Sequence, residues 1–123
     1  AHPNRLFVEA GAGAAAGFSD QAYTEAGVEV VKTAAALFKE ADIVAKVRKP
    51  LDDEVAAMRE GAIFVGHAET CDQDPAVSAM QRKNIRVVAM ERIPRISRAQ
   101  SMDALSSQSN IAGYRAVIEA GNN

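Results

Sequence analysis

This sequence of 123 residues lacks the features that mark several large classes of protein. Its single cysteine, Cys71, excludes an internal disulfide and suits a reducing compartment. No apolar run approaches the roughly 18 residues that span a bilayer, and the first residues show no signal-peptide pattern. We therefore expect a cytoplasmic protein, or one that faces the cytoplasm, with no direct insertion into the membrane.

The chain also lacks the basic excess of a nucleic-acid-binding protein, because its formal net charge is −2. Its basic residues are unevenly distributed: six of them and one acid, Glu91, lie between Arg82 and Arg98. A positive field of this kind can attract an anionic ligand such as a nucleotide phosphate. For each side chain taken singly, a solvated face is the simpler explanation.

Short apolar runs alternate with helix-like segments along the whole chain. Strands are predicted at 6–8, 28–31, 43–47, 62–65 and 85–90, and helices at 20–26, 33–41, 51–59, 75–84 and 103–119. Most of the strands are continuous apolar runs, as in strands buried on both faces of a parallel sheet. We therefore predict one α/β domain over residues 1–123, with three layers: a parallel sheet of about five strands flanked by helices, Rossmann- or flavodoxin-like.

The loop from Gly11 to Gly17 follows a strand and resembles a dinucleotide fingerprint, in which glycines let the backbone approach a pyrophosphate. Its last gap is one residue too long, and the next helix begins only at Ser19 or Asp20. We interpret the loop as a turn before a capped helix, with phosphate binding as the less favoured alternative.

Possible metal ligands are dense in one stretch, which contains His67, Glu69, Cys71, Asp72 and Asp74. A zinc site usually needs further ligands elsewhere, and the only other histidine is His2 at the N-terminus. We therefore expect no metal. We also expect no nucleophilic role for Cys71, because the chain offers no second plausible histidine partner.

Two further residues occupy unusual places. His67 follows a predicted strand, and sites in parallel sheets lie at the carboxyl ends of the strands. Lys46 lies within the apolar run 43–47, where a buried lysine is costly unless it is paired. Lys46 therefore either reaches solvent at the strand end or serves a site.

The segment 94–110 combines arginines, a glutamine, an aspartate and several hydroxyl groups in a loop that leads into a helix. Asp103 can cap that helix, and Ser106 and Ser107 lie one turn further on. These groups can grip the amide of a nicotinamide ring and orient it. An elaborate helix cap explains them equally well.

This segment resembles the alpha-subunit family of the proton-translocating NAD(P) transhydrogenases. The match runs over 93–107 and continues over 110–117, and earlier pieces agree at 8–13, 17–20, 26–27, 41–44 and 46–50. Alanine dehydrogenases share the N-terminal domain and these earlier pieces. They carry a different sequence where this chain has Arg95 to Ser107, so that segment favours transhydrogenase.

The resemblance implies hydride transfer between NAD(H) and NADP(H), coupled to proton movement through a separate membrane domain. It implies that Arg95, Gln100 and Asp103 contact the nicotinamide end of NAD(H), where the reaction takes place, and that Ser106 supports them. In the family a further strand and helix precede the position of Leu6, and a glycine-rich NAD-binding domain follows this one.

We therefore expect a fragment that is inactive alone and that relies on the missing domain for most of its grip on NAD(H). The expected partners are a second copy in a homo-oligomer such as a dimer, and the NADP(H)-binding and membrane domains at the cytoplasmic face of the membrane. No nucleic acid and no metal are expected.

Two alternatives stay open. One is an oxidoreductase domain like that of alanine dehydrogenase, because Lys46 matches a substrate-binding lysine of those enzymes and His67 falls near their catalytic histidine. The residues around His67 do not align with that family. The other alternative is a non-catalytic binding or dimerisation module, such as a truncated gene product.

Overall fold

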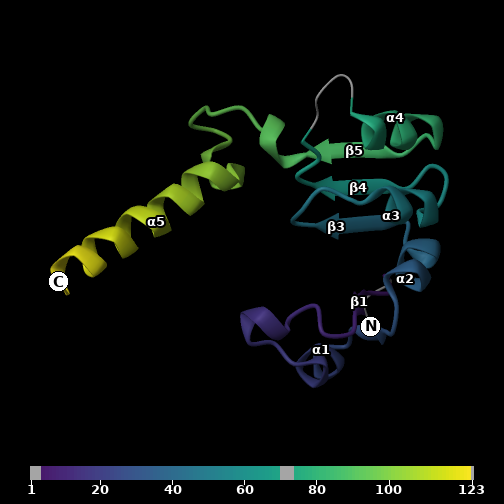
Figure 1. Ribbon diagram of the computed structural model, residues 1–123, viewed down its shortest axis with the longest axis horizontal. Coiled ribbons are helices and arrows are strands. Elements are labelled where there is room, and N and C mark those ends of the chain that lie inside the picture. The colour runs from purple at the N-terminus through teal and green to yellow at the C-terminus, as the bar shows by residue number, and fades with distance from the viewer. Residues whose placement is uncertain (1–3, 70–73, 123) are drawn as a thin grey trace.

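A computed structural model describes residues 4–69 and 74–122 and shows strands alternating with helices (Figure 1). The strands are β1 (Phe7–Glu9), β2 (Glu29–Val31), β3 (Ile43–Lys46), β4 (Ile63–Gly66) and β5 (Arg86–Ala89). The α-helices are α1 (Asp20–Glu25), α2 (Ala34–Glu40), α3 (Asp52–Ala57), α4 (Pro75–Arg82) and α5 (Ala104–Gly121). Three short 3-10 helices are η1 (Ala14–Ala16), η2 (Met90–Arg92) and η3 (Gln100–Met102). Each predicted strand and helix is present.

Helix ends lie where the sequence predicts them. The side chains of Ser19, Thr33 and Asp74 each accept a hydrogen bond from a backbone N–H in the first turn of α1, α2 and α4. These bonds satisfy N–H groups that have no partner within the helix. Gly27 follows the predicted end of this helix at residue 26 and has φ of 84°, in the left-handed region that glycine enters without steric cost.

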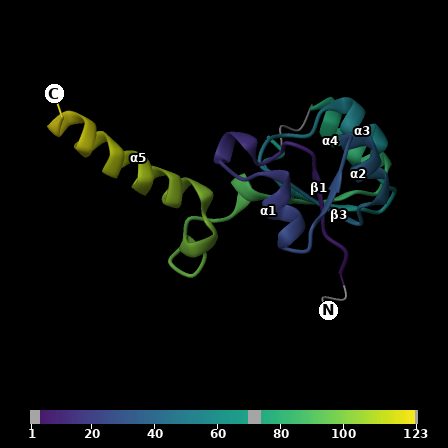
Figure 2. The ribbon, with the colours of Figure 1, turned by 90° about the horizontal axis from the view of Figure 1, so that it is seen from below.

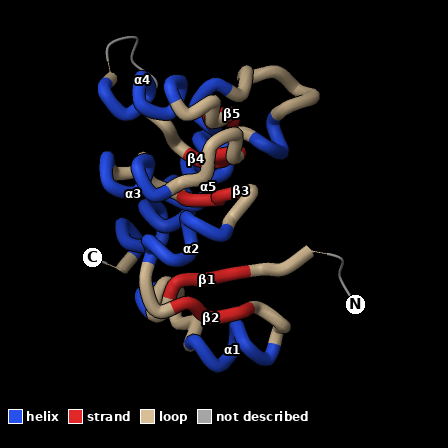
Figure 3. Tube along the Cα trace, turned by 90° about the vertical axis from the view of Figure 1, so that its right-hand side faces the viewer, coloured by secondary structure: helices blue, strands red, loops and turns tan. Residues whose placement is uncertain are grey.

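Within the described residues, all strand pairs are parallel and form two hydrogen-bonded groups, β1 with β2 and β3-β4-β5 in that order. Figure 3 shows the strands stacked as β2, β1, β3, β4, β5, with a wider separation between β1 and β3. Val44 pairs with Phe64, which pairs with Val87, so the middle of the larger group is in register. The predicted α/β fold with about five parallel strands is confirmed. The division into two groups was not predicted.

Helices α2, α3 and α4 lie side by side along one face of the strands (Figure 3). The core between them consists of Phe38, Ala41, Val44, Val55, Met58, Phe64, Ala68, Met80 and Ile85. Lys83, just after α4, donates from Nζ to three carbonyl oxygens at the C-terminal end of α3, at 2.5 to 3.2 Å. A cation is favourable there because the helix dipole is negative at that end. Lys83, one of the six clustered basic residues, therefore has a structural role.

Burial differs from the expectation that the strands are covered on both faces. Phe64 in β4 is 0% exposed, whereas Ile43 in β3 is 63% exposed and Val88 in β5 is 49% exposed. Successive side chains of a strand point to opposite faces, so a strand covered on one face alternates between buried and exposed positions. The second face of β3 and β5 carries this exposed apolar surface in the described part of the chain.

Helix α5 extends away from the strands and from the helices that cover them (Figures 1 and 2). It contacts the rest of the molecule at its start, beside η2, and every residue from 107 to 122 is exposed. Among the described residues, no helix combines the length and apolar character that crossing a bilayer requires.

Candidate functional site

The segment between η2 and α5 carries the residues predicted to form the site. It is held at two buried positions, Ala99 and Asp103, which are each 6% exposed. Between them η3 turns outward, and its residues Gln100 to Met102 are exposed. The loop is therefore anchored at two points and presents the side chains between them to solvent.

Asp103 is the anchor at the head of α5. Its carboxylate accepts hydrogen bonds from Ser106 Oγ at 2.6 Å and from the backbone N–H of Leu105 at 3.0 Å. The hydroxyl of Ser106 is the main cause that lowers the pKa of Asp103; burial opposes it, and the Leu105 N–H and the positive charge of Arg95 lower the pKa further. The predicted cap is confirmed, and its carboxylate is ionised at neutral pH.

Arg95 and Gln100 are placed differently. Both side chains are exposed. Arg95 acts on Asp103 through its charge, whereas Gln100 is joined to it through the backbone, where the Gln100 carbonyl accepts the Asp103 N–H at 3.3 Å. The structure thus brings Asp103 and Ser106 into direct contact and leaves Arg95 and Gln100 accessible nearby.

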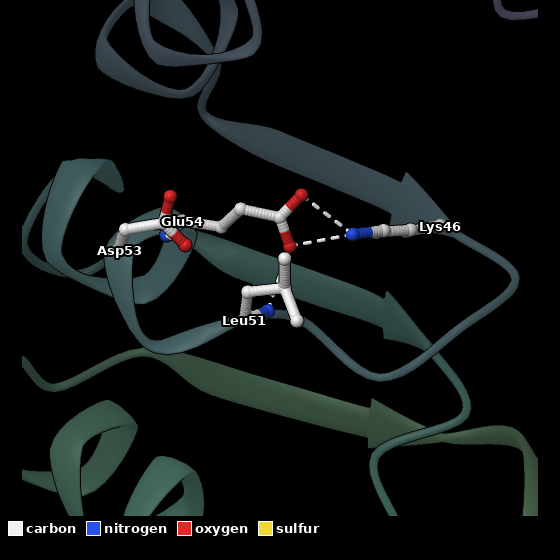
Figure 4. Close-up of polar contacts among 4 residues, drawn as sticks. All are labelled: Lys46, Leu51, Asp53 and Glu54. Atoms are coloured by element: carbon white, nitrogen blue, oxygen red, sulfur yellow. Dashed lines mark hydrogen bonds and ion pairs between the residues drawn. The ribbon is translucent and has the colours of Figure 1, made fainter.

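Lys46 ends β3 and is paired with Glu54 in the first turn of α3 (Figure 4). Lys46 Nζ lies 2.6 and 2.5 Å from the two carboxylate oxygens of Glu54, and Glu54 Oε2 also accepts the backbone N–H of Leu51 at 2.7 Å. The pairing offsets the cost of partly burying the lysine. The sequence analysis did not identify Glu54 as the partner of Lys46. The available signal was its position: an acid at the third residue of a helix usually accepts the backbone N–H of the N-cap residue, here Leu51, which keeps its carboxylate near the start of the helix.

A cleft of about 500 Å³ opens at the carboxyl ends of β3 and β4, where the sequence placed His67. Val47, Arg48, Lys49, His67 and Glu69 line it. This is the usual place for a site in a parallel sheet.

Carboxylates lie beside two of the basic side chains at this cleft, Lys49 and His67. Lys49 forms an ion pair with Asp74, and this hydrogen bond raises the pKa of Lys49 and lowers that of Asp74. His67 Nδ1 lies 3.8 Å from Glu91 Oε2, an oxygen that also accepts the backbone N–H of Ala68. Of the metal ligands considered from the sequence, Asp74 is thus engaged by Lys49, while Cys71 and Asp72 lie outside the described residues.

Backbone N–H groups of the glycine-rich loop from Gly11 to Gly17 form hydrogen bonds within the protein. The N–H of Gly11 donates to Asp20 Oδ1 at 2.8 Å, and the carbonyl of Gly13 accepts the N–H groups of Ala16 and Phe18. A pyrophosphate would need such N–H groups and would meet the negative charge of Asp20. The geometry favours a turn before a capped helix over a phosphate site.

Gly13 has a packing reason within this loop. A Cβ added there would lie 2.7 Å from the Tyr23 ring and 2.8 Å from the Phe18 carbonyl oxygen. Close packing of the loop on α1 therefore explains this glycine without a ligand.

The family comparison agrees with this geometry. A family model described as "Alanine dehydrogenase/PNT, N-terminal domain" matches residues 1–112. The chain belongs to this family.

Within the family, the chain is 55% identical over 116 residues to the NAD(P) transhydrogenase subunit alpha of Cereibacter sphaeroides. This match covers 94% of the chain and 22% of that protein. The crystal structure of transhydrogenase from Sinorhizobium meliloti matches with a TM-score of 0.85 and 46% identity, over 96% of this chain and 35% of that one. A structure of L-alanine dehydrogenase matches with a TM-score of 0.67 and 28% identity, over 72% and 24% of the two chains. The chain spans about a fifth to a third of the length of these relatives. The resemblance inferred from residues 93–107 is confirmed.

Proposed function

We propose that this chain is the nicotinamide-side part of the NAD(H)-binding component of a transhydrogenase, which transfers hydride between NAD(H) and NADP(H) and couples this to proton translocation. The observation that carries the proposal is the similarity itself. Identity is 55% and 46% to the two transhydrogenase chains, against 28% to alanine dehydrogenase. The segment 93–107, where the resemblance favours transhydrogenase, contains the anchored and exposed loop before α5 and the first turn of α5.

In this proposal the loop works by positioning. Asp103, held by Ser106 and Leu105, fixes where the loop ends. Each carboxylate oxygen has two lone pairs, so in this proposal the carboxylate also accepts a hydrogen bond from the nicotinamide amide. Arg95 and Gln100 are accessible and bear donor groups for the amide oxygen of the ring. The cofactor supplies the hydride, and the side chains orient it toward the second nicotinamide.

The adenosine and pyrophosphate end of NAD(H) has no matching site in this proposal. Because most backbone N–H donors of the loop from Gly11 to Gly17 are bonded within the protein, other parts of a longer subunit would hold that end. NAD(H) then binds weakly to the 123-residue chain, which is inactive alone. We propose further that the component acts as a homo-oligomer at the cytoplasmic face of the membrane, with NADP(H)-binding and membrane domains as partners.

The test is hydride transfer by the complete subunit, measured in single turnovers with its NADP(H)-binding partner. Arg95→Ala and Gln100→Ala should each slow transfer by about a hundredfold, because a misplacement near 1 Å can cost that much. The thermal midpoint should change little, since both side chains are exposed. NADH affinity should fall much less than the rate, because in this proposal other parts of a longer subunit bind most of the nucleotide. Arg98→Ala, a change at another exposed arginine of the loop, is the matched control. Transfer at the parent rate in both variants would refute the site assignment.

A second candidate is an alanine-dehydrogenase-like oxidoreductase domain, favoured by the cleft that Lys49 and His67 line beside Lys46. Alanine-dependent reduction of NAD⁺ by the complete subunit, lost in His67→Ala, would support it. The ion pair between Lys46 and Glu54 counts against a substrate-binding role for Lys46, because its ammonium group already has a carboxylate partner. Absence of this activity would remove the second candidate, and the single-turnover measurement would then distinguish transhydrogenation from a non-catalytic module.

A further inference from the structure

Glu91 lies where the chain leaves the sheet. The parallel strands β4 and β5 are paired up to Gly66 and Ala89, which end the ladder. Ala68 lies two residues beyond Gly66, and Glu91, in η2, lies two residues beyond Ala89. The side chain of Glu91 therefore joins the two segments just beyond the point where their backbones stop pairing.

The contact between these segments is a hydrogen bond to a buried residue. Glu91 Oε2 accepts the backbone N–H of Ala68 at 3.2 Å. Ala68 is 0% exposed and belongs to the hydrophobic core, where a backbone N–H needs a partner. An ionised carboxylate is a stronger acceptor than a neutral group. The bond therefore ties η2 to the core through the end of β4.

The imidazole of His67 lies beside the same carboxylate, at a longer distance. His67 Nδ1 is 3.8 Å from Glu91 Oε2, beyond hydrogen-bond range, and the His67 side chain is 41% exposed. An attraction at this distance requires a protonated imidazole and is weakened by solvent. The hydrogen bond from Ala68 needs no such proton, so it is the contact that holds η2.

The position of η2 decides where the loop that follows it lies. We call residues 93–103 the site loop. It begins directly after η2, and α5, which follows the loop, contacts η2 at its start. Figure 1 shows this segment leading away from the carboxyl end of β5. Because both ends of the site loop meet η2, a shift of η2 would displace the whole loop.

We propose that Glu91 is a positioning residue of the site loop. By holding η2 on the end of β4, its carboxylate fixes where Arg95 and Gln100 present their donor groups and where Asp103 begins α5. The proposal gives a role to the single acid among the six basic residues between 82 and 98. This inference rests on the proposed function, which assigns the site loop to NAD(H), and it adds a residue outside the predicted site.

Two substitutions of Glu91 and one control separate this role from a general effect on stability. Glu91→Gln keeps an oxygen that can accept the Ala68 N–H, whereas Glu91→Ala removes the acceptor. Lys83→Met removes hydrogen bonds to the end of α3 and should lower the thermal midpoint. Lys83 precedes β5, at the opposite end of the strands from η2, so its loss should leave the site loop in place.

The first measurement uses the chain without nucleotide. A nitroxide label on Ser101→Cys, in η3, in a Cys71→Ser background reports motion of the site loop by electron paramagnetic resonance. Glu91→Ala should shift the spectrum toward the narrow lines of a mobile label, and Glu91→Gln and Lys83→Met should keep the parent spectrum. An unchanged spectrum in Glu91→Ala, or the same narrowing in Lys83→Met, would overturn the proposal.

The second measurement is single-turnover hydride transfer by the complete subunit with its NADP(H)-binding partner. Glu91→Ala should slow transfer by about tenfold to a hundredfold, because a misplacement near 1 Å can cost that much. NADH affinity should fall much less than the rate, and Glu91→Gln should transfer hydride near the parent rate. A parent rate in Glu91→Ala, or an equal loss in Glu91→Gln, would contradict the role of the Ala68 bond.

This inference and the proposed function fail separately. If Arg95→Ala and Gln100→Ala slow hydride transfer while Glu91→Ala does not, the proposed function stands and the role of Glu91 is wrong. If Arg95→Ala and Gln100→Ala both transfer hydride at the parent rate, the assignment of the loop to NAD(H) fails. The label spectrum then still shows whether Glu91 fixes the site loop, because it is measured without nucleotide.

Discussion

The strands with α2, α3 and α4 differ from the segment that follows β5 in how each is held together. In the first region, helices cover one face of the strands, and the side chains of Phe64, Val55 and Met80 are almost fully buried. Charged side chains there also form hydrogen bonds between elements, as Lys83 does. In the second region, Ala99 and Asp103 are the buried residues, and α5 is exposed along most of its length. Stability therefore resides mainly in the first region.

The difference separates two kinds of residue in this chain. A substitution in the core changes the free energy of unfolding through lost packing. A substitution at an exposed loop residue such as Arg95 should change stability little, and in the proposed function it weakens the positioning of the cofactor. Measuring stability and activity on the same variants shows how far this division extends.

The largest effect on stability is expected at Phe64, the fully buried side chain of the central strand β4. Phe64→Ala should lower the free energy of unfolding by about 3–5 kcal/mol, because it removes a large apolar contact and leaves a cavity. Phe18→Ala is the matched control, since Phe18 is 58% exposed. Urea denaturation measures both, and a similar small loss in the two variants would contradict the assignment of the core.

An intermediate effect is expected at the glycines, with opposite signs in the two regions. In Gly66→Ala the new Cβ would lie 1.9 Å from the Lys46 carbonyl oxygen, so β3 and β4 must separate locally, at a cost of about 1–3 kcal/mol. In Gly113→Ala the new Cβ meets nothing within 4 Å, and α5 should gain about 0.5–1 kcal/mol. Thermal denaturation followed by circular dichroism measures both. A stabilising Gly66→Ala would show that the close approach of β3 and β4 is wrong.

The smallest effect is expected from the charge of Asp103. Because its pKa is lower in the folded protein, the stability it contributes is present above its unfolded pKa of about 3.9 and is lost as the pH falls through the lowered folded pKa. Asp103→Asn should therefore melt at a slightly lower temperature than the parent at pH 7. The difference in melting temperature between the parent and Asp103→Asn should become smaller below a pH of about 4. A gap of the same size at low pH would show that the carboxylate charge is not what holds α5.

Several parts of this structure could be predicted because their signals are local. The caps Ser19, Thr33, Asp74 and Asp103 depend on a side chain and a backbone N–H two or three residues later. The strand positions follow from short apolar runs. The position of His67 followed from the strand before it and from the rule that sites gather at carboxyl ends.

The partners of the polar side chains were not predictable in the same way. Lys46 meets Glu54, and Lys49 meets Asp74, only because the chain crosses from a strand end to the start of a helix in a particular direction. Asp20 faces Gly11 for a similar reason: α1 folds back against the loop that precedes it. These contacts depend on angles between elements, about which residue order says little.

By itself the sequence determined the α/β class, the order of the elements, the capped helix starts and the family resemblance of residues 93–107. Each of these depends on neighbours along the chain, whose geometry is limited by backbone sterics and hydrogen bonding. The tertiary structure decided that the strands form two groups, that Lys46 is paired, that Asp103 is buried while Arg95 and Gln100 are exposed, and that α5 stands clear of the body. These features depend on which surfaces meet once separate segments pack, because burial and pairing are properties of contacts between distant parts of the chain.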